Sequence, residues 1–521
     1  MDKSEGISRA SLTCLIAVVL LSLHAFLYLN FLTDDALISL RYAKRLLDGK
    51  GLTWTDGEYV EGYSNLLWVL CVAAIGSLGF DLVQVARVLG ALLMAGAVVL
   101  TCGRSIFAAL LLTSTGLIAA WSVGGLEQPL LAVLLALSLN QAHRIFSRND
   151  YSNGSVLLCS LWLGLLSLSR SDGVLFTLPI AAAQLFGSAD ARRKIINICL
   201  LVSLPALLLG LHTAFRLYYY GEWVSNIAHV KISPTWKVLE YGIRYATRGY
   251  GAIFPLALLG GVGLGLLIRR RAYFPTVIMV FLSLAAWTAY MVFIGGDVNP
   301  PSRHFVPIAV LLCFGLRVFL SASETAKQAG WLRPIFPLIF LVHIPLQLLD
   351  AENRDAMQNY SQGVWRGKEL GLLLKERFAA QEHKPLIAVD AAGAVPYWSE
   401  LPALDMLGLN DRYLAKNPPA NFGQGWIAHG LGSGEYVLKR SPDIIIFGHP
   451  FGSEPGFISG KELLANPEFH ARYEQGRLLI ECRRTERCEK FEASLWVRKG
   501  SSLATAFYDT PTDVNLLPLG N

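Results

Sequence analysis

The sequence predicts a polytopic α-helical membrane protein that carries a soluble α/β domain at its C-terminal end. Hydrophobic residues make up 53% of the 521-residue chain and charged residues only 16%, well below the roughly 25% of an average soluble protein. Apolar stretches of about 17–25 residues, the length that crosses ~30 Å of hydrocarbon, recur between Ser11 and Leu349. The remainder has an ordinary polar composition. We therefore divide the chain into a transmembrane domain, 1–349, and a soluble domain, 350–521.

The hydrophobic pattern predicts eleven membrane spans. They lie at approximately 12–32, 82–103, 105–122, 126–143, 154–169, 173–187, 195–219, 250–268, 273–294, 304–320 and 332–349. The first is too long for the core of a signal peptide and no A-x-A-like cleavage site follows it, so we expect an uncleaved anchor with a cytoplasmic N-terminus. The apolar stretch 66–78 has only about thirteen residues, which predicts an interfacial or re-entrant segment.

The basic residues between the spans support this topology, because short cytoplasmic loops carry an excess of Lys and Arg. With eleven spans, five loops on one face contain such residues: Arg104, Arg144 with Arg148, 192–194, 269–271, and Lys327 with Arg333. An odd number of spans places the C-terminal domain on the opposite, extracytoplasmic face. The net charge of +6 follows this loop pattern, so we expect membrane lipid and no nucleic acid as a partner.

Candidate catalytic residues follow the first span directly, in Thr33-Asp34-Asp35. Two adjacent carboxylates at the border of the lipid are costly unless they pair or face water, so they are functional candidates. Asp34 and Asp35 are each a candidate general base or a ligand for a divalent cation; the alternative is a solvated pair that ends the helix. Glu61 and Tyr63, in the segment VEGYSN, close the same loop as candidate substrate contacts, although this segment is also an ordinary turn.

Two short external loops carry further charges between apolar spans. Glu127 follows two glycines, and Arg170 and Asp172 stand two residues apart in the segment RSDG. Such charges are not expected in hydrocarbon without a partner or a water-filled cavity. We therefore treat all three as candidate substrate-binding residues. The alternative for each loop is a tight turn with an incidental charge.

Two more external loops supply candidate phosphate contacts. Asp297 is followed by Arg303 and His304; Arg recognises phosphate through paired donors, while His304 is equally suited to cap the next span. His229 and Lys231 lie in a loop after a tyrosine triplet, and Lys231 is a candidate phosphate contact, with a solvated loop as the alternative. All these clusters share one membrane face, which predicts a single external, acid-lined cavity. The positions of these candidate residues identify no specific metal site, and they leave a bound divalent cation possible.

The C-terminal domain alternates short β-like runs with helical patterns. The expected strands are 386–390, 443–448, 478–482 and 494–498, with a helix at 367–379 between the first of them and the membrane part. Six of the eight cysteines lie in apolar segments, where cysteine is usually a small hydrophobic residue. Cys482 and Cys488 flank a polar run, and a disulfide between them is possible in an oxidising compartment.

Several segments together resemble a known family. The motifs TDDALISLRYAKRLLDGKGL, VEGYSN, GGLEQPL, RSDG and GGD followed by RHFVP, and in the tail DAAGAVPYWSELPALDMLGLND and AHGLGSGEYVLKRSPDIIIF, cover residues 30 to 450. They resemble the GT-C glycosyltransferases that include the mycobacterial terminal β-(1→2)-arabinofuranosyltransferases and their proteobacterial relatives. Two departures are RSDG, where relatives have RPDG or RPEG, and the varied segment 298–302.

The resemblance implies a GT-C fold and transfer of a sugar, arabinofuranose in the best-known members, from a polyprenyl-phosphate donor to a cell-envelope glycan or glycoprotein. It implies a catalytic role for Asp34 and Asp35, of which we favour Asp34 as the base and Asp35 as the neighbour of the loop helix. The expected location is the bacterial inner membrane, with the active site and the C-terminal domain in the periplasm. A transporter or flippase of lipid-linked sugars is the alternative, because intramembrane charges also fit ion coupling.

Overall fold

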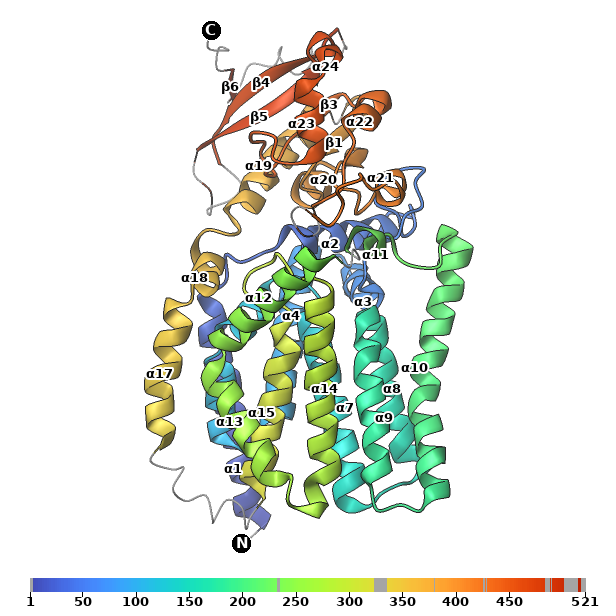
Figure 1. Cartoon of the computed structure of the whole chain (residues 1–521). Helices are drawn as coiled ribbons and strands as arrows, with labels where there is room; N and C mark the ends of the chain where they lie inside the picture. Colours follow the sequence, from blue (N-terminus) through green and yellow to red (C-terminus); the bar gives the residue numbers. More distant parts are fainter. Residues whose placement is uncertain are drawn as a thin grey trace.

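The computed structural model has a helical part with a small sheet domain at one end (Figure 1). The residues it describes are 3–231, 235–322, 335–378, 380–424, 427, 429–482, 488, 490–500 and 514–516. The N-terminus lies at the far end of the helical part from the sheet domain. The basic residues expected at Lys327 and Arg333 lie outside the described residues.

The helical part is built from apolar helices that run between two faces (Figure 1). Their bounds are α1 Lys3–Phe26, α4 Leu82–Cys102, α5 Ile106–Thr113, α6 Gly116–Val123, α7 Gln128–Arg148, α8 Asn153–Ser169, η1 Ser171–Phe176, α9 Thr177–Ala183, η2 Gln184–Phe186, α10 Ala191–Tyr220, α13 Phe254–Leu267, η3 Arg271–Tyr273, α14 Phe274–Phe293, α15 Phe305–Ser321 and α17 Ile335–Leu349. Every expected span has a helix or a pair of helices at its position in the described residues.

The predicted number of eleven spans is not confirmed. In the described residues, four helices are long and apolar enough to cross a membrane, and six if each of two bent pairs counts as one span. The expected span 105–122 is broken between α5 and α6 by a 67° bend, where the hydroxyls of Ser114 and Thr115 bond back to carbonyls of the preceding turn. The second bend, of 86°, lies before Pro255, which lacks an N–H and therefore favours the first turn of a helix.

Shorter helices lie near the end of the bundle that faces the sheet domain. They are α2 Asp34–Leu47, α3 Leu66–Gly76, α11 Asn226–Lys231, α12 Trp236–Ala252 and α18 Ala351–Gln358. Helix α2 lies across the upper ends of the bundle, below the sheet domain (Figure 1). The hydroxyl of Thr33 caps its first turn by accepting a hydrogen bond from the Ala36 N–H at 3.2 Å. This cap begins the helix at the two adjacent aspartates.

The C-terminal domain contains one six-stranded sheet in the order β2-β1-β3-β5-β4-β6. Strands β2, β1 and β3 are parallel, whereas β5, β4 and β6 continue the sheet antiparallel. The strands are β1 Ile387–Val389, β2 Ala403–Asp405, β3 Ile444–Ile446, β4 Tyr473–Ile480, β5 Phe491–Arg498 and β6 Val514–Leu516. The helices are α19 Gln362–Arg377, α20 Ala394–Ser399, α21 Arg412–Lys416, α22 Gly434–Arg440, α23 Ile458–Ala465 and α24 Pro467–Arg472. The C-terminal α/β domain predicted from the sequence is confirmed as a small sheet domain.

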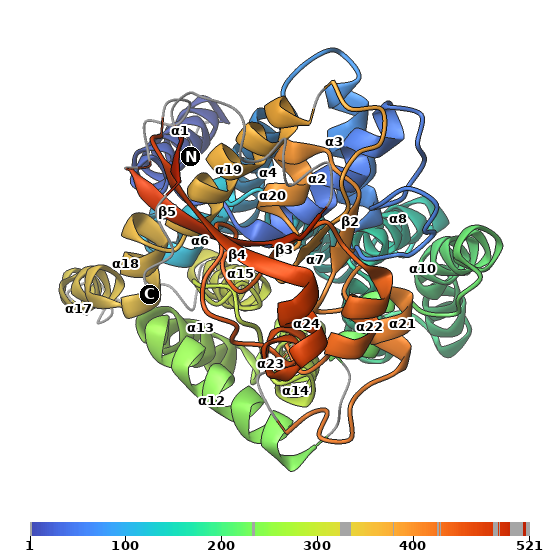
Figure 2. The ribbon, with the colours of Figure 1, turned by 90° about the horizontal axis from the view of Figure 1, so that it is seen from above.

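The sheet domain covers the end of the bundle when seen from above (Figure 2). The carboxyl end of β1 points toward α2, because the segment that follows this strand binds the first turn of that helix. Strand β2, of three residues, was not predicted from the sequence. Cys482 and Cys488 form a disulfide between the end of β4 and the segment before β5.

Candidate active site

The two adjacent aspartates of α2 face different parts of the protein. The carboxylate of Asp34 accepts hydrogen bonds from the backbone N–H groups of Gly393 and Ala394, both at 2.8 Å. A Cβ atom on Gly393 would lie 2.0 Å from the Asp34 carbonyl oxygen, so glycine is needed for this close approach. Burial raises the pKa of the Asp34 carboxyl to about 6, although the two N–H groups oppose the shift. Asp34 therefore joins the sheet domain to α2.

Asp35 instead lines a cavity between the helix ends and the sheet domain, as expected for neighbours that point about 100° apart on a helix. The side chain of Asp35 is 36% exposed, whereas that of Arg303 beside it is 5% exposed. The geometry favours Asp35 over Asp34 as the base, because the Asp34 carboxylate does not line the cavity. Arg41, on the same helix, pairs with neither aspartate in the described residues and donates to the carbonyl oxygens of Trp54 and Leu401 at 2.6 and 2.7 Å.

The cavity, together with the open space at its mouth, has a volume of about 790 Å³. Of the residues expected at the site, six line it: Asp35, Tyr63, Glu127, Lys231, Asp297 and Arg303. They come from α2, the first external loop, the loops before α7 and α15, and α11. Residues far apart in the sequence thus line one cavity with several acidic groups. The sequence predicted a single acid-lined cavity.

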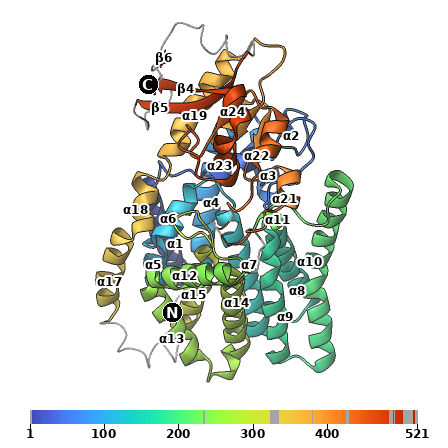
Figure 3. The same cartoon turned by 45° about the horizontal axis from the view of Figure 1, so that its top comes forward.

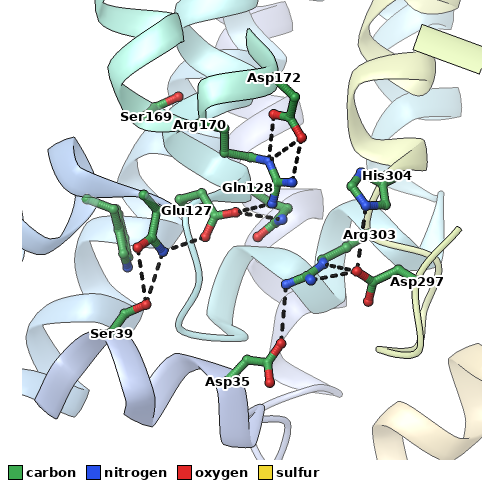
Figure 4. A network of polar contacts seen from close by, with 12 residues as sticks. Asp35, Ser39, Glu127, Gln128, Ser169, Arg170, Asp172, Asp297, Arg303 and His304 are labelled. Atoms are coloured by element: carbon green, nitrogen blue, oxygen red, sulfur yellow. Dashed lines mark hydrogen bonds and ion pairs between the residues drawn. The ribbon is translucent and has the colours of Figure 1, made fainter. Parts of the chain in front are cut away.

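One cluster of charges in this cavity centres on Arg303 (Figure 4). Its guanidinium donates to Asp297 Oδ2 from Nε at 2.9 Å and from Nη2 at 2.5 Å, and Nη1 lies 3.7 Å from Asp35 Oδ2. The amide of Asn299 donates to the same Asp35 oxygen at 2.9 Å. Burial acts to raise the pKa of Asp297, but the charge of Arg303 outweighs burial and holds this pKa well below its usual range. Asp297 is therefore a fixed anion that orients Arg303.

Lys231 is the cation in this cavity that has unused donors. Its Nζ lies 4.0 Å from Asp297 Oδ2 and makes no hydrogen bond among the described residues. Burial and the neighbouring Arg303 lower the pKa of Lys231. An ammonium in this environment would gain from an anionic ligand, because all three of its N–H donors remain available.

A second cluster lies deeper, around Arg170 (Figure 4). Its guanidinium donates to Glu127 Oε1 at 2.7 Å and to Asp172 Oδ2 at 2.6 Å. Glu127 Oε2 accepts from the amide of Asn65 at 2.8 Å, and Asp172 Oδ2 accepts from the hydroxyl of Tyr290 at 2.7 Å. Both carboxylates are thus satisfied by protein donors. This arrangement makes the cluster a scaffold that joins α7 to the end of α8, with only Glu127 reaching the cavity.

We expect Arg170→Met to destabilise the protein strongly. The change leaves Glu127 and Asp172 buried without their counterion, and breaking a buried ion pair from one side costs about 3–5 kcal/mol. This corresponds to a fall of roughly 10 °C in the melting temperature, measured by tryptophan fluorescence in detergent. The control is Arg148→Met at the exposed end of α7. The triple change Arg170→Met, Glu127→Gln, Asp172→Asn should recover much of the loss; an unchanged melting temperature in the single variant would contradict this account.

Other expected site residues lie outside the cavity lining. Glu61 is buried and pairs with His212 at 3.1 Å and with Arg216, both on α10, so it anchors the first loop to that helix. His304 Nε2 lies 3.6 Å from Asp297 Oδ2, behind the loop. His229 is half-buried on α11 and does not line the cavity. Arg170 and Asp172 stand behind Glu127.

Two lining residues with an amide side chain and one with an imidazole were not among the candidate site residues. Asn65 stands beside the predicted Glu61 and Tyr63, so its position in VEGYSN was the available signal. Asn299 bridges Asp35 and Asp297, and its own amide oxygen accepts from Tyr360 at 2.6 Å. His429 reaches the cavity from the C-terminal domain. Only the packing of that domain on the helices brings His429 there.

The described residues contain no group of three or more His, Cys, Asp or Glu side chains arranged to hold a metal ion. The space between Asp35 and Asp297 is taken by the side chains of Arg303 and Asn299. These donors satisfy the oxygens that a cation between the two acids would use. The divalent cation that the sequence left possible therefore has no assigned ligands.

Comparisons with known proteins agree with the fold described above. Residues 353–498 match a family model described as a domain of unknown function (DUF8728). No curated protein sequence matches the chain. Among solved structures, the Archaeoglobus fulgidus oligosaccharyltransferase in complex with zinc and sulfate has a TM-score of 0.51 at 14% identity, over 96% of this chain and 74% of that chain.

Two further structures are similar at low sequence identity. The A. fulgidus oligosaccharyltransferase AglB, in complex with an inhibitory peptide and a dolichol-phosphate, has a TM-score of 0.50 at 12% identity, over 98% of this chain and 75% of that one. ArnT from Cupriavidus metallidurans, bound to undecaprenyl phosphate, has a TM-score of 0.48 at 15% identity, over 76% of this chain and 85% of that chain.

The chain is a multi-pass membrane protein with a GT-C fold. At 12–14% identity the oligosaccharyltransferase structures show the fold alone. The predicted GT-C fold is thus confirmed, and the arabinofuranosyltransferase subgroup stays a prediction.

Proposed function

We propose that this protein is a membrane glycosyltransferase that transfers a sugar from a polyprenyl-phosphate donor to a cell-envelope glycan or glycoprotein. The observation that carries the proposal is the pairing, in one cavity, of a partly exposed carboxylate, Asp35, with two cations, the half-buried Lys231 and the buried Arg303. A hydroxyl that must lose a proton and a phosphate that must gain stabilisation need these two kinds of group side by side. AglB, which shares the fold, was solved with a dolichol-phosphate.

The geometry supports a direct displacement. The acceptor oxygen attacks the anomeric carbon and its proton passes to the carboxylate of Asp35. The bond from that carbon to the phosphate oxygen breaks, and its electron pair leaves with the polyprenyl phosphate. Lys231 and Arg303 stabilise the charge that develops on this phosphate, which already is a good leaving group and needs little acid catalysis. Asp297 holds Arg303 in place through two hydrogen bonds.

Arabinofuranose is the sugar that we propose first, because the resemblance to the arabinofuranosyltransferases rests on the segments that supply Asp35, Glu127 and Asp297. We also propose that the cavity and the sheet domain face the periplasm across a bacterial inner membrane. Support comes from the basic loop residues, such as Arg104, Arg148 and Arg192, which follow the positive-inside rule on the opposite face.

The test is a transfer assay with purified full-length protein. The protein is incubated with radiolabelled polyprenyl-phospho-arabinofuranose, or a matched hexose donor, and envelope glycan from cells that lack the gene. Label that enters the glycan supports the proposal and identifies the sugar. Release of the donor across a vesicle membrane without any label in the glycan would instead indicate a flippase and overturn the proposed reaction.

A further inference from the structure

A second cavity, of about 1270 Å³, opens beside the active site where the first external loop, the end of α10 and the helices α21 and α22 meet. Figure 3 shows α21 and α22 on the side of the sheet domain that faces α10. The residues that carry the argument are Tyr59, Tyr219, Tyr413, Tyr436, Arg412 and Arg440. The proposed transfer reaction does not use any of them.

The cavity is rich in tyrosine rings that are held in pairs. Tyr413 stacks on Tyr436 with ring centroids 4.3 Å apart and an angle of 17° between the rings. Tyr59 meets Tyr219 edge to face at 5.1 Å. Tyr59 is 51% exposed and Tyr413 is 49% exposed, although both stand at the wall of a cavity. Rings fixed in this way offer apolar faces and hydroxyl edges at a low entropy cost.

The charged groups of this cavity are held in place by one another. Arg440 donates to the Tyr436 hydroxyl at 2.8 Å and to Glu58 at 2.6 Å, and that hydroxyl donates to Asp411 at 2.8 Å. At the other side, Glu222 pairs with Lys416 at 2.5 Å and with Arg412 at 3.4 Å.

The cations Arg412, Lys416 and Arg440 are thus balanced by Glu58, Asp411 and Glu222. Glu222 pairs with Arg412 and Lys416 from outside the lining. Because each cation of the wall already has a carboxylate partner, the described lining offers no free cation for a phosphate or a polyanion. Fixed donors and acceptors around aromatic faces instead match an uncharged sugar, which has hydroxyls at its rim and C–H groups on its faces.

The same two chain segments build both cavities. The first loop lines the second cavity up to Val60 and the active-site cavity from Gly62, while the tail lines the active-site cavity at Leu409 and the second cavity from Asp411. Between them stands Tyr42, whose hydroxyl bonds to the N–H of Gly62 at 2.9 Å and to Asn410 at 3.1 Å. The two cavities are therefore neighbours, separated by the buried ring of Tyr42 and the segments bonded to it.

We propose that this second cavity binds a neutral sugar residue of the acceptor glycan, at a distance from the hydroxyl that reacts. The identification of this sugar as part of the acceptor rests on the proposed function, but the binding itself does not require transfer. It gives the sheet domain a role in substrate recognition and predicts that longer acceptors bind more tightly than single sugars.

The test measures binding of full-length protein in detergent to an array of neutral pentose and hexose oligosaccharides of increasing length. Tyr413→Ala should lower the affinity about tenfold, because the ring loses its stacking surface. Tyr436→Phe keeps a ring to stack on Tyr413 but loses the bond to Asp411, so we expect a smaller loss. The control is Tyr218→Ala: this neighbouring tyrosine of α10 is 90% exposed and does not line the cavity. A second arm measures binding to vesicles of phosphatidylglycerol.

Each outcome decides the inference. Oligosaccharide binding that weakens in Tyr413→Ala but not in Tyr218→Ala supports it. Absence of oligosaccharide binding, or equal binding by both variants, overturns it. The inference is also overturned if the protein binds only the vesicles and that binding depends on Tyr413. Asp35→Asn separates the two proposals: it should bind the glycan normally. If wild-type protein binds the glycan but transfers nothing, the reaction is wrong and this site stands.

Discussion

Asp35→Asn should lower the rate of sugar transfer by about 10²–10⁴-fold, the usual contribution of a general base. The replacement keeps the shape of the side chain and can still accept the hydrogen bond from Asn299, so the cavity should remain intact. What it loses is the ability to take the proton of the acceptor hydroxyl. The measurement is kcat for purified protein with polyprenyl-phosphate-linked sugar and acceptor.

Two comparisons make this prediction specific. Asp48→Asn changes an exposed aspartate after the last turn of the same helix and should leave kcat unchanged. Asp34→Asn weakens the contact with Gly393 and Ala394 and should lower stability more than kcat. If Asp35→Asn kept more than about a tenth of the wild-type rate, Asp35 would not be the base.

Lys231→Met should lower kcat/KM by about 10²–10³-fold, as does the loss of one donor to a developing negative charge. Methionine fills nearly the same space, and Asp297 keeps both hydrogen bonds from Arg303, so the loop should stay folded. The matched control is Lys50→Met, an exposed lysine of the first external loop. A rate within threefold of wild type would remove Lys231 from the phosphate site.

The pH profile provides a second readout for Lys231. Because burial and Arg303 lower the pKa of Lys231, its ammonium is lost as pH rises at a lower pH than for an ordinary lysine. We therefore expect kcat/KM, which reports the free enzyme, to fall at alkaline pH. Lys231→Arg should keep a positive charge and move this fall to higher pH. An identical alkaline limb in both proteins would assign it to another group.

The composition and the positions of charge in the sequence were sufficient for the class of fold. Long apolar stretches can be stable only in lipid or in a buried core, so the helical part followed from hydrophobicity alone. Short apolar runs bounded by turns likewise located β1, β3, β4 and β5. Helix length was less predictable, because breaks such as that between α5 and α6 depend on hydroxyl–carbonyl bonds and not on hydrophobicity.

The sequence predicted which types of residue form the site and that they share one membrane face. It did not predict the role of each residue. Acids and bases in short external loops are costly without partners, and this cost marked Asp35, Glu127, Asp297 and Arg303. Which of two adjacent aspartates faces the cavity depends on the docking of another part of the chain. Gly393, far along the sequence, decides this for Asp34.

The sequence by itself determined that the chain is a membrane protein with a small α/β domain and with its charges gathered on one face, since local hydrophobicity and charge are properties of segments. Only the tertiary structure decided that Asp35 opens to the cavity, that Arg303 stands between two acids, and that Tyr59 and Tyr413 share a second cavity. Apart from the Arg303–Asp297 pair, these are contacts between segments separated by hundreds of residues. Their geometry arises from packing, which no local pattern in the chain encodes.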